Sequence, residues 1–221
     1  EGAILKDMTI IAADGNSISY EGLTFEGLTF ENSRISITGW RTNGAVVKNF
    51  TVTNCIFRNL DDNTNSAPVH INMAATEPVN GFIFTNNVID GATGGSKSGI
   101  YAQVTGKVLV SGNVINNVSF RPYVIQVTTD DGIADNFIVT ENTFSGSAAG
   151  RAQGLGNNDE GTDAVTIVVS DNIFKGITDA QQICYWNFND ATTEFDLSGN
   201  YYDIDILANP SRIYYNGAAS G

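Results

Sequence analysis

The sequence predicts an all-β fold, a single-stranded right-handed parallel β-helix solenoid of about seven coils. Three observations indicate it: a ten-residue block recurs along the chain, apolar residues alternate inside the block, and a second short apolar segment follows nearly every copy. Alternation with a period of two predicts strands, and self-similarity at a period of about 20–50 residues predicts a repeat architecture. No stretch has the period of an amphipathic helix, so we expect coils made only of strands and loops.

The block is clearest in FIVTENTFSG, which begins at Phe137. Six further copies align with it: ISYEGLTFEG from Ile18, FTVTNCIFRN from Phe50, FIFTNNVIDG from Phe82, VLVSGNVINN from Val108, IVVSDNIFKG from Ile167 and FDLSGNYYDI from Phe195. The starts are 26 to 32 residues apart, which is too short for a propeller blade of about 40 residues. This length fits one coil of a parallel β-helix, stacked about 4.8 Å above the last, with the right-handed crossovers found in nearly all proteins.

Within the block, places one to four are expected to form a strand, places five and six a tight turn, and places seven and eight the next strand. Place six is Leu23 in the first copy and Cys55 in the second, and then Asn in five successive copies: Asn87, Asn113, Asn142, Asn172 and Asn200. Amides stacked at one corner bond to the neighbours above and below. Since Asn also tolerates a left-handed backbone, we expect these residues to form both the ladder and the sharp corner. Place four forms a parallel stripe of Thr and Ser, as at Thr53 and Thr85.

A second strand is expected after each block, and its outward side chains form the candidate binding row. The segments are ISI near Ile35, VHINM from Val69, IYAQV from Ile100, VIQV from Val124, ICYW from Ile183 and RIYY from Arg212, with a weak AQGLG from Ala152. Alternation directs Val69, Ile71 and Met73 inward and their neighbours outward. The expected ligand-binding row is His70, Asn72, Tyr101, Gln103, Gln126 and Trp186, with Gln153 between the last two.

Size, charge and composition limit the class of protein. Residues 1–221 are taken as one β-helix domain, which we expect to come from a longer secreted or surface protein whose other domains are its neighbours. The net charge of −13 with 11 basic residues disfavours nucleic acid and anionic membrane surfaces. No apolar run approaches the roughly 20 residues that span a bilayer. An acidic, charge-poor chain rich in Asn, Thr, Ser and Gly is typical of secreted bacterial proteins.

The cysteines and the histidine exclude several kinds of site. Cys55 and Cys184 belong to the second and sixth copies, so the predicted rungs separate them by about 19 Å. A disulfide needs Cα atoms within about 7 Å, and we therefore predict two free thiols. The single histidine, His70, excludes a multi-histidine metal site.

With its ladder of five asparagines, the repeat resembles the pectate-lyase-like (pectin-lyase-like) β-helix superfamily over about residues 18 to 216. In that superfamily such a ladder lies at the turn between the second and third strands of a coil. The resemblance therefore implies that the VHINM-type segments are first strands, with variable loops overhanging the usual binding face. The superfamily contains polysaccharide lyases and hydrolases, phage tailspikes, adhesins and binding modules, so the fold alone does not choose among them.

The resemblance to pectate lyases also implies carboxylates that hold Ca²⁺ near an Arg or Lys that abstracts a proton. The candidate catalytic residues are Asp61, Asp62, Lys97 and Arg121; the alternative interpretation, which we favour, is loop-surface charge. The stretch NNDEGTD offers Asp159, Glu160 and Asp163 as oxygen ligands for Ca²⁺, against the alternative of a solvated acidic edge. No other cofactor is expected. His70 is flanked by Val69 and Ile71, so the Gly-His-Gly of polygalacturonases is absent.

The outward row is the better functional lead. Planar amides bond sugar hydroxyls, and aromatic faces stack on the apolar faces of sugar rings. We therefore expect a noncatalytic carbohydrate-recognition or adhesion module of a secreted or cell-surface bacterial protein, with a polysaccharide or glycan as partner. The alternatives are a polysaccharide lyase or glycoside hydrolase acting on an acidic polysaccharide, a structural spacer or phage-tail fragment, and a polar sheet exterior without a ligand.

Overall fold

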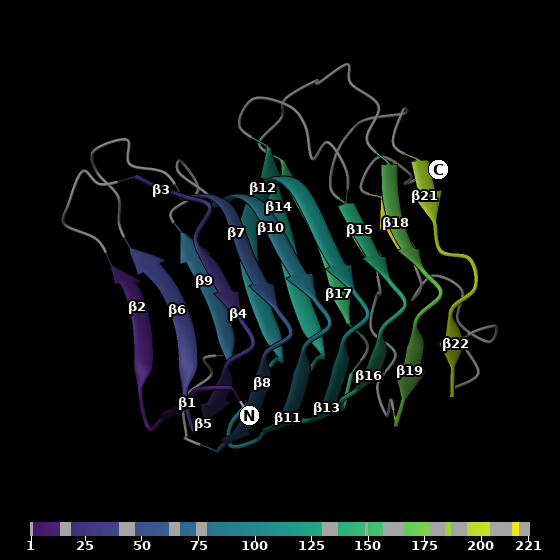
Figure 1. Ribbon diagram of the computed structural model, residues 1–221. Helices are drawn as coiled ribbons and strands as arrows, with labels where there is room; N and C mark the ends of the chain where they lie inside the picture. Colours follow the sequence, from purple (N-terminus) through teal and green to yellow (C-terminus); the bar gives the residue numbers. More distant parts are fainter. Residues whose placement is uncertain are drawn as a thin grey trace.

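The computed structural model is a parallel β-solenoid, in which strands from successive coils lie side by side from the N-terminal to the C-terminal end (Figure 1). It describes residues 2–13, 19–39, 47–61, 67–73, 79–129, 137–148, 150–156, 166–176, 184–186, 194–203 and 214–216. Across these residues there is no helix, and hence none long and apolar enough to cross a membrane. The all-β parallel solenoid is thereby confirmed, whereas the hand of winding and the number of about seven coils stay predictions.

The strands form three stacks, named here by their order within a coil. The first stack contains β2 (Thr9–Ala13), β6 (Arg34–Gly39), β9 (Val69–Met73), β12 (Ile100–Ser111), β14 (Tyr123–Thr129), β17 (Arg151–Gly156), β20 (Cys184–Trp186) and β23 (Tyr214–Asn216). The second stack contains β3 (Tyr20–Glu21), β4 (Thr24–Glu26), β7 (Val47–Thr53), β10 (Val79–Thr85), β15 (Phe137–Thr140), β18 (Thr166–Ser170) and β21 (Glu194–Asp196). The long β12 pairs with β9 and β14 through its first half and with β10 and β15 through its second half, so it belongs to both stacks.

The third stack is an eight-stranded parallel sheet. It contains β1 (Ile4–Lys6), β5 (Thr29–Glu31), β8 (Ile56–Leu60), β11 (Val88–Ala92), β13 (Val114–Val118), β16 (Thr143–Ser145), β19 (Ile173–Lys175) and β22 (Tyr201–Tyr202). The strands β1 and β2, together with their turn, were not expected from the repeat, because residues 4–13 contain no copy of the block. Every segment expected as a second strand is a strand of the first stack, including the weak AQGLG in β17.

The core is the file of inward side chains shared by the three stacks. In the third stack each strand places one large residue inside, and neighbouring rings stack, with Phe30 and Phe57 centroids 4.5 Å apart at 7° and Phe174 and Tyr202 centroids 4.9 Å apart at 12°. Because identical strand positions recur at each rung, the inward residue of one coil packs on that of the next, with Ile89 and Ile115 between the two aromatic runs. Repetition in the sequence thus becomes a continuous core along the solenoid axis.

The predicted asparagine ladder is confirmed. Each amide oxygen accepts the backbone N–H of place six in the preceding coil, at 2.8 Å from Cys55 N to Asn87 Oδ1 and 2.9 Å from Asn113 N to Asn142 Oδ1. Each Nδ2 donates to a place-three carbonyl of the preceding coil, and in all but the last asparagine it also donates to the Oδ1 of the next ladder residue, as Asn142 does to Val110 O at 3.0 Å and Asn172 Oδ1 at 2.9 Å. The first four asparagines are at most 1% exposed. The ladder therefore pairs backbone groups that would otherwise be buried without partners.

The expectation that the ladder asparagines take the left-handed backbone is wrong. Positive φ falls one residue earlier, at place five. These residues are Gly27 (65°), in the register that the structure gives the first copy, and then Asn54 (53°), Asn86 (55°), Gly112 (67°), Glu141 (58°), Asp171 (55°) and Gly199 (67°). The place-five residue makes the sharp turn, and the place-six side chain can then point into the core. Turning and hydrogen bonding are separate tasks carried by adjacent residues.

The first copy of the block is also out of register. Residues 21–30 contain EGLTF twice in succession, and the first EGLTF was aligned with the later blocks. The structure pairs the second: Phe30 lies opposite Phe57, and Phe25 lies opposite Val52 in β7. The block therefore starts at Leu23 rather than Ile18, and place six is Leu28 rather than Leu23. Both alignments satisfy the apolar pattern, and only pairing with the next coil distinguishes them.

Of the two predicted free thiols, Cys55 is confirmed as a free, buried cysteine. It occupies place six at the N-terminal end of the ladder, where its Sγ lies 3.3 Å from Thr53 O and 3.6 Å from Phe25 O. The side chain of Cys184 lies outside the described part of the chain.

Candidate functional site

The outward row of the first stack follows the expected alternation. Val69, Ile71, Ile100, Ala102 and Val104 are fully buried, whereas His70, Tyr101, Gln103 and Gln126 are half-buried and point outward. Strand register defines two outward columns. One runs Ser36, His70, Tyr101, Val124, Arg151, and the other contains Gln103 and Gln126, with the backbone of Gln153 next in register.

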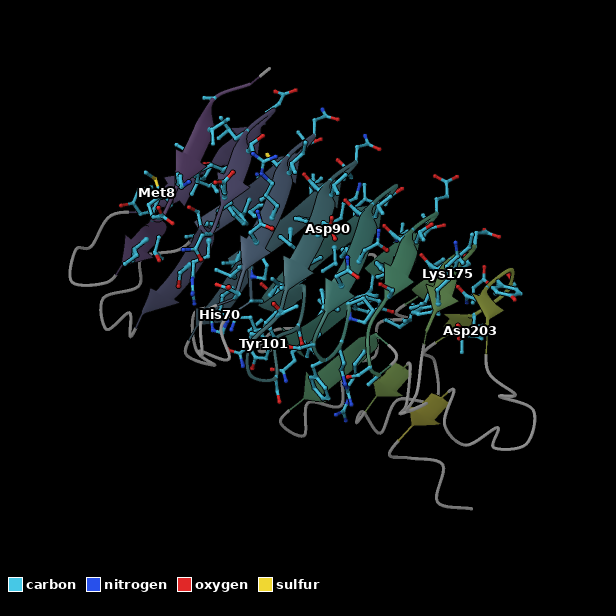
Figure 2. All side chains as sticks on the ribbon, turned by 90° about the horizontal axis from the view of Figure 1, so that it is seen from below. Met8, His70, Asp90, Tyr101, Lys175 and Asp203 are labelled. Atoms are coloured by element: carbon cyan, nitrogen blue, oxygen red, sulfur yellow. The ribbon has the colours of Figure 1, made fainter. Side chains whose placement is uncertain are left out.

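His70 and Tyr101 form an aromatic pair on adjacent strands. They lie directly opposite each other in β9 and β12, with ring centroids 5.0 Å apart and ring planes 15° apart, and Figure 2 shows the two side chains next to each other. The buried Nδ1 of His70 has no hydrogen-bond partner among the described residues. Because the rings are stacked, each covers one face of the other, and the pair presents its edges and its two outer faces.

Burial governs the protonation of this pair. Burial, and secondarily the charge of Arg34, lowers the pKa of His70 below its usual value. The imidazole is therefore held neutral, so it can accept as well as donate a hydrogen bond. Burial raises the pKa of Tyr101, and a hydrogen bond with the Gln103 side chain opposes that shift. Both rings are uncharged at neutral pH.

The glutamines continue the row as an amide pair. Gln103 Nε2 donates to Gln126 Oε1 at 2.9 Å, which aligns the two side chains across neighbouring coils. Backbone pairing then places Gln153 opposite Gln126 and Tyr185 opposite Gln153. The rings of His70 and Tyr101 and the amides of Gln103 and Gln126 thus occupy adjacent positions on one exterior surface.

The other predicted row members are placed only by their backbone. Asn72 lies opposite Thr38 in β6, and its side chain is outside the described part of the chain, as are those of Gln153 and Trp186. Trp186 pairs with Gly154, in the column that contains Val127, so by register Tyr185 rather than Trp186 continues the glutamine column. The part assigned to Trp186 in binding stays a prediction.

The structure gives two of the four catalytic candidates buried positions. Lys97 is 0% exposed and Arg121 is 3% exposed. Lys97 Nζ donates to Gly94 O at 2.6 Å, and its backbone N–H donates to Ser119 Oγ at 2.8 Å, while the guanidinium carbon of Arg121 lies 4.8 Å from the ring centroid of Phe120. Asp61 is exposed, and Asp62 lies outside the described residues. Lys97 is thus bonded within its own loop and to the loop that precedes β14.

Electrostatic coupling nevertheless links several of these groups. Burial lowers the pKa of Lys97, the charge of Arg34 lowers it further, and Asp61 opposes the shift. Arg34, whose own pKa is lowered by burial, therefore influences both His70 and Lys97. Sequence reasoning missed Arg34; the available signal was its position at the start of the ISI strand, one coil before His70.

The predicted Ca²⁺ ligands Asp159, Glu160 and Asp163 all lie outside the described residues. Among the residues that are described, no three His, Cys, Asp or Glu side chains come together as a metal site.

The chain is thus a parallel β-solenoid with a half-buried row of aromatic and amide side chains on its first stack. No protein-family model, curated protein or solved structure matches it.

Proposed function

We propose that this β-solenoid is a carbohydrate-recognition or adhesion module of a secreted or cell-surface bacterial protein. We further propose that it is a divergent member of the pectate-lyase-like β-helix superfamily, since an inward asparagine ladder at one corner is the feature on which that resemblance rests. The ligand would be a glycan lying along the outward row of the first stack.

The observation that supports binding is the stacked pair of His70 and Tyr101 beside the bonded amides of Gln103 and Gln126. The edges and outer faces of half-buried aromatic rings can contact the apolar face of a sugar, and amides fix the positions of its hydroxyls. Because the row follows the solenoid axis at about 4.8 Å per rung, an extended chain can contact several coils.

Burial of the cationic candidates weighs against the lyase alternative. A proton-abstracting base must come within hydrogen-bond reach of its substrate, and the ammonium of Lys97 is closed off from solvent and bonded to Gly94 O. Catalysis by Lys97 would require its loop to open, whereas recognition without catalysis would not.

A glycan array tests the proposal directly. The wild-type chain is expected to bind at least one glycan, and the His70→Ala/Tyr101→Ala variant is expected to lose at least about tenfold in affinity, equivalent to about 1.4 kcal/mol. A matched control is Thr53→Ala/Thr85→Ala, which removes another directly bonded pair on adjacent coils, with Oγ1 atoms 3.0 Å apart, but on the second stack. Circular dichroism and thermal melts verify that both variants are folded.

The outcomes are distinguishable. Binding that is lost in the aromatic variant and kept in the threonine control supports the first-stack row as the site. Absence of binding to any glycan, or unchanged binding by the folded aromatic variant, overturns the proposal. Release of unsaturated sugars from an acidic polysaccharide would establish the lyase alternative.

A further inference from the structure

The third stack carries an exposed apolar column that the core does not use. Successive strands align the following residues on its outer surface: Ile4, Thr29, Ile56, Val88, Val114, Thr143, Ile173 and Tyr201. Five of the eight large hydrophobic side chains exposed among the described residues belong to this apolar column, with exposures of 53% for Ile4, 42% for Ile56, 37% for Val114, 37% for Ile173 and 59% for Tyr201.

A charged column runs beside it, two residues further along each strand. In order it contains Lys6, Glu31, Arg58, Asp90, Asn116, Ser145, Lys175 and Asp203. Glu31 bridges its two neighbours, with Lys6 Nζ at 2.9 Å and Arg58 Nη2 at 2.7 Å. In Figure 2 the labelled Asp90 and Lys175 lie on a different side of the solenoid from His70 and Tyr101.

The solenoid's own stability does not require the apolar column. The core of this stack is already supplied by the inward residues of the same strands, among them Phe30, Phe57 and Phe144, which are at most 1% exposed. Single exposed apolar residues are ordinary, but apolar side chains that recur along one column, interrupted here only by Thr29 and Thr143, and that are bordered by charges mark an interaction surface. Its length, the whole eight-stranded sheet, indicates a partner that is itself elongated.

We propose that the third stack binds a second copy of this chain, face to face, with the two solenoid axes antiparallel. A two-fold axis parallel to the strands keeps each column opposite its own copy and reverses the order of the rungs. Lys6 then faces the second copy's Asp203, and Glu31 faces its Lys175. Arg58 faces Ser145, and Asp90 faces Asn116, so no like charges meet.

The opposite arrangement fails on charge. A two-fold axis parallel to the solenoid axis keeps the order of the rungs but exchanges the two columns, so the apolar side chains would lie against the charged ones, Ile4 opposite Lys6. If that axis instead lay over the charged column, Lys6 would face Lys6 and Glu31 would face Glu31, and like charges brought together at an interface disfavour association. In the antiparallel arrangement the apolar column also pairs with itself, Val88 against Val114 at the centre and Ile4 against Tyr201 at the ends. Charge order therefore selects the antiparallel dimer.

The interface area predicts a weak dimer. Eight strands at about 4.8 Å give a length of about 38 Å, and two outward columns cover a width of about 12 Å, so the pair buries about 900 Å² in total. Specific interfaces usually bury about 1,200–2,000 Å², and smaller ones are transient. Association is accordingly expected at high micromolar concentrations.

Sedimentation velocity of the full chain from about 1 μM to about 1 mM tests the proposal. A monomer–dimer equilibrium is expected for the wild type and is expected to vanish in Ile56→Lys/Val114→Lys. Ile11→Lys is the matched control, because Ile11 is 58% exposed but lies in β2 of the first stack. A monomer at every concentration, or a dimer that survives the double substitution, overturns the proposal.

A charge exchange tests the antiparallel order. Lys175→Glu places two carboxylates opposite each other and is expected to weaken the dimer about tenfold, whereas Glu31→Lys/Lys175→Glu restores the opposite charges. Melting curves check that loss of the Lys6–Glu31–Arg58 bridge leaves the fold intact. Unchanged dimerisation in Lys175→Glu overturns the stated order.

If the chain is monomeric and Ile56→Lys/Val114→Lys instead loses glycan binding, the column is a ligand surface and the dimer is excluded.

Discussion

Two columns of the solenoid, the asparagine corner and the outward row of the first stack, use repetition in opposite ways. The corner carries the same residue from Asn87 to Asn200, and each amide before the last is bonded to both neighbouring coils. The outward row changes at every rung, from Ser36 through His70, Tyr101 and Val124 to Arg151. Both columns are built on the same stacked backbone.

The difference separates structure from recognition. A buried amide must match its neighbour, because an unpaired partner costs about 1–3 kcal/mol, so one residue type is required at every rung. An outward position has no such requirement, and its variation from coil to coil provides a surface with a distinct chemistry at each level. Departure from the repeat on the solenoid exterior is therefore where binding is best sought.

Breaking the asparagine ladder at the corner is expected to have the largest effect on stability. Asn142→Leu removes the acceptor of Asn113 N and leaves Val110 O without its donor. We expect the free energy of unfolding to fall by about 3 kcal/mol, measured by urea denaturation, with glycan binding unchanged. The exposed Asn80→Leu is the matched control and should cost less than about 0.5 kcal/mol. Lost binding with unaltered stability would contradict the structural assignment of Asn142.

Extending the asparagine ladder by one coil is expected to stabilise the fold. Cys55 occupies the ladder position, and its Sγ lies 3.6 Å from Phe25 O, where an amide Nδ2 would donate as Asn87 does to Val52 O. Cys55→Asn is therefore expected to raise the free energy of unfolding by about 1 kcal/mol. Cys55→Ser is the control, because it lacks the reach of an amide. An asparagine variant less stable than the serine variant would show that the N-terminal coils do not accept the ladder.

The turn beside the ladder gives a smaller effect. Glu141 holds a φ of 58°, which costs an L-residue about 1–2 kcal/mol relative to glycine, partly offset by the greater chain entropy of glycine when unfolded. Glu141→Gly is expected to gain about 0.5 kcal/mol in thermal unfolding. Gly112→Ala should do the reverse, since φ is 67° there and a Cβ would lie 2.5 Å from Asn86 Oδ1. Equal effects at the two positions would contradict the assignment of turning to place five.

The burial of His70 in the outward row is expected to make the stability of the chain depend on pH. The pKa of His70 is lowered in the folded chain by burial and by Arg34, so the unfolded chain binds the proton more readily. Its contribution to stability is present above the ordinary value of about 6.5 and is lost as the pH falls below it. His70→Gln should therefore reduce the loss of melting temperature between about pH 8 and pH 5. An identical pH profile for the variant and the wild type would show that His70 is not desolvated.

Sequence patterns predicted much of this molecule because they recur. Seven aligned blocks averaged out local ambiguity, and the ladder from Asn87 to Asn200 and the inward file of Val69, Ile71, Ile100 and Ala102 follow directly from them. The register of the first coil was predicted wrongly because EGLTF occurs twice within ten residues, and both registers satisfy the same alternation. Burial of Lys97 and Arg121 was equally invisible, because charge in a loop normally indicates exposure.

The sequence by itself determined the fold class, the strand order and the identity of the corner that carries the amides, because periodicity states which side chains share a face. Only the tertiary structure decided which EGLTF pairs with Phe57, that place five makes the turn, and that one exterior sheet aligns Ile4, Ile56 and Val114. Those features depend on contacts between residues about 30 positions apart. The physical reason is that register and exposure are properties of neighbouring coils together, and no single coil contains them.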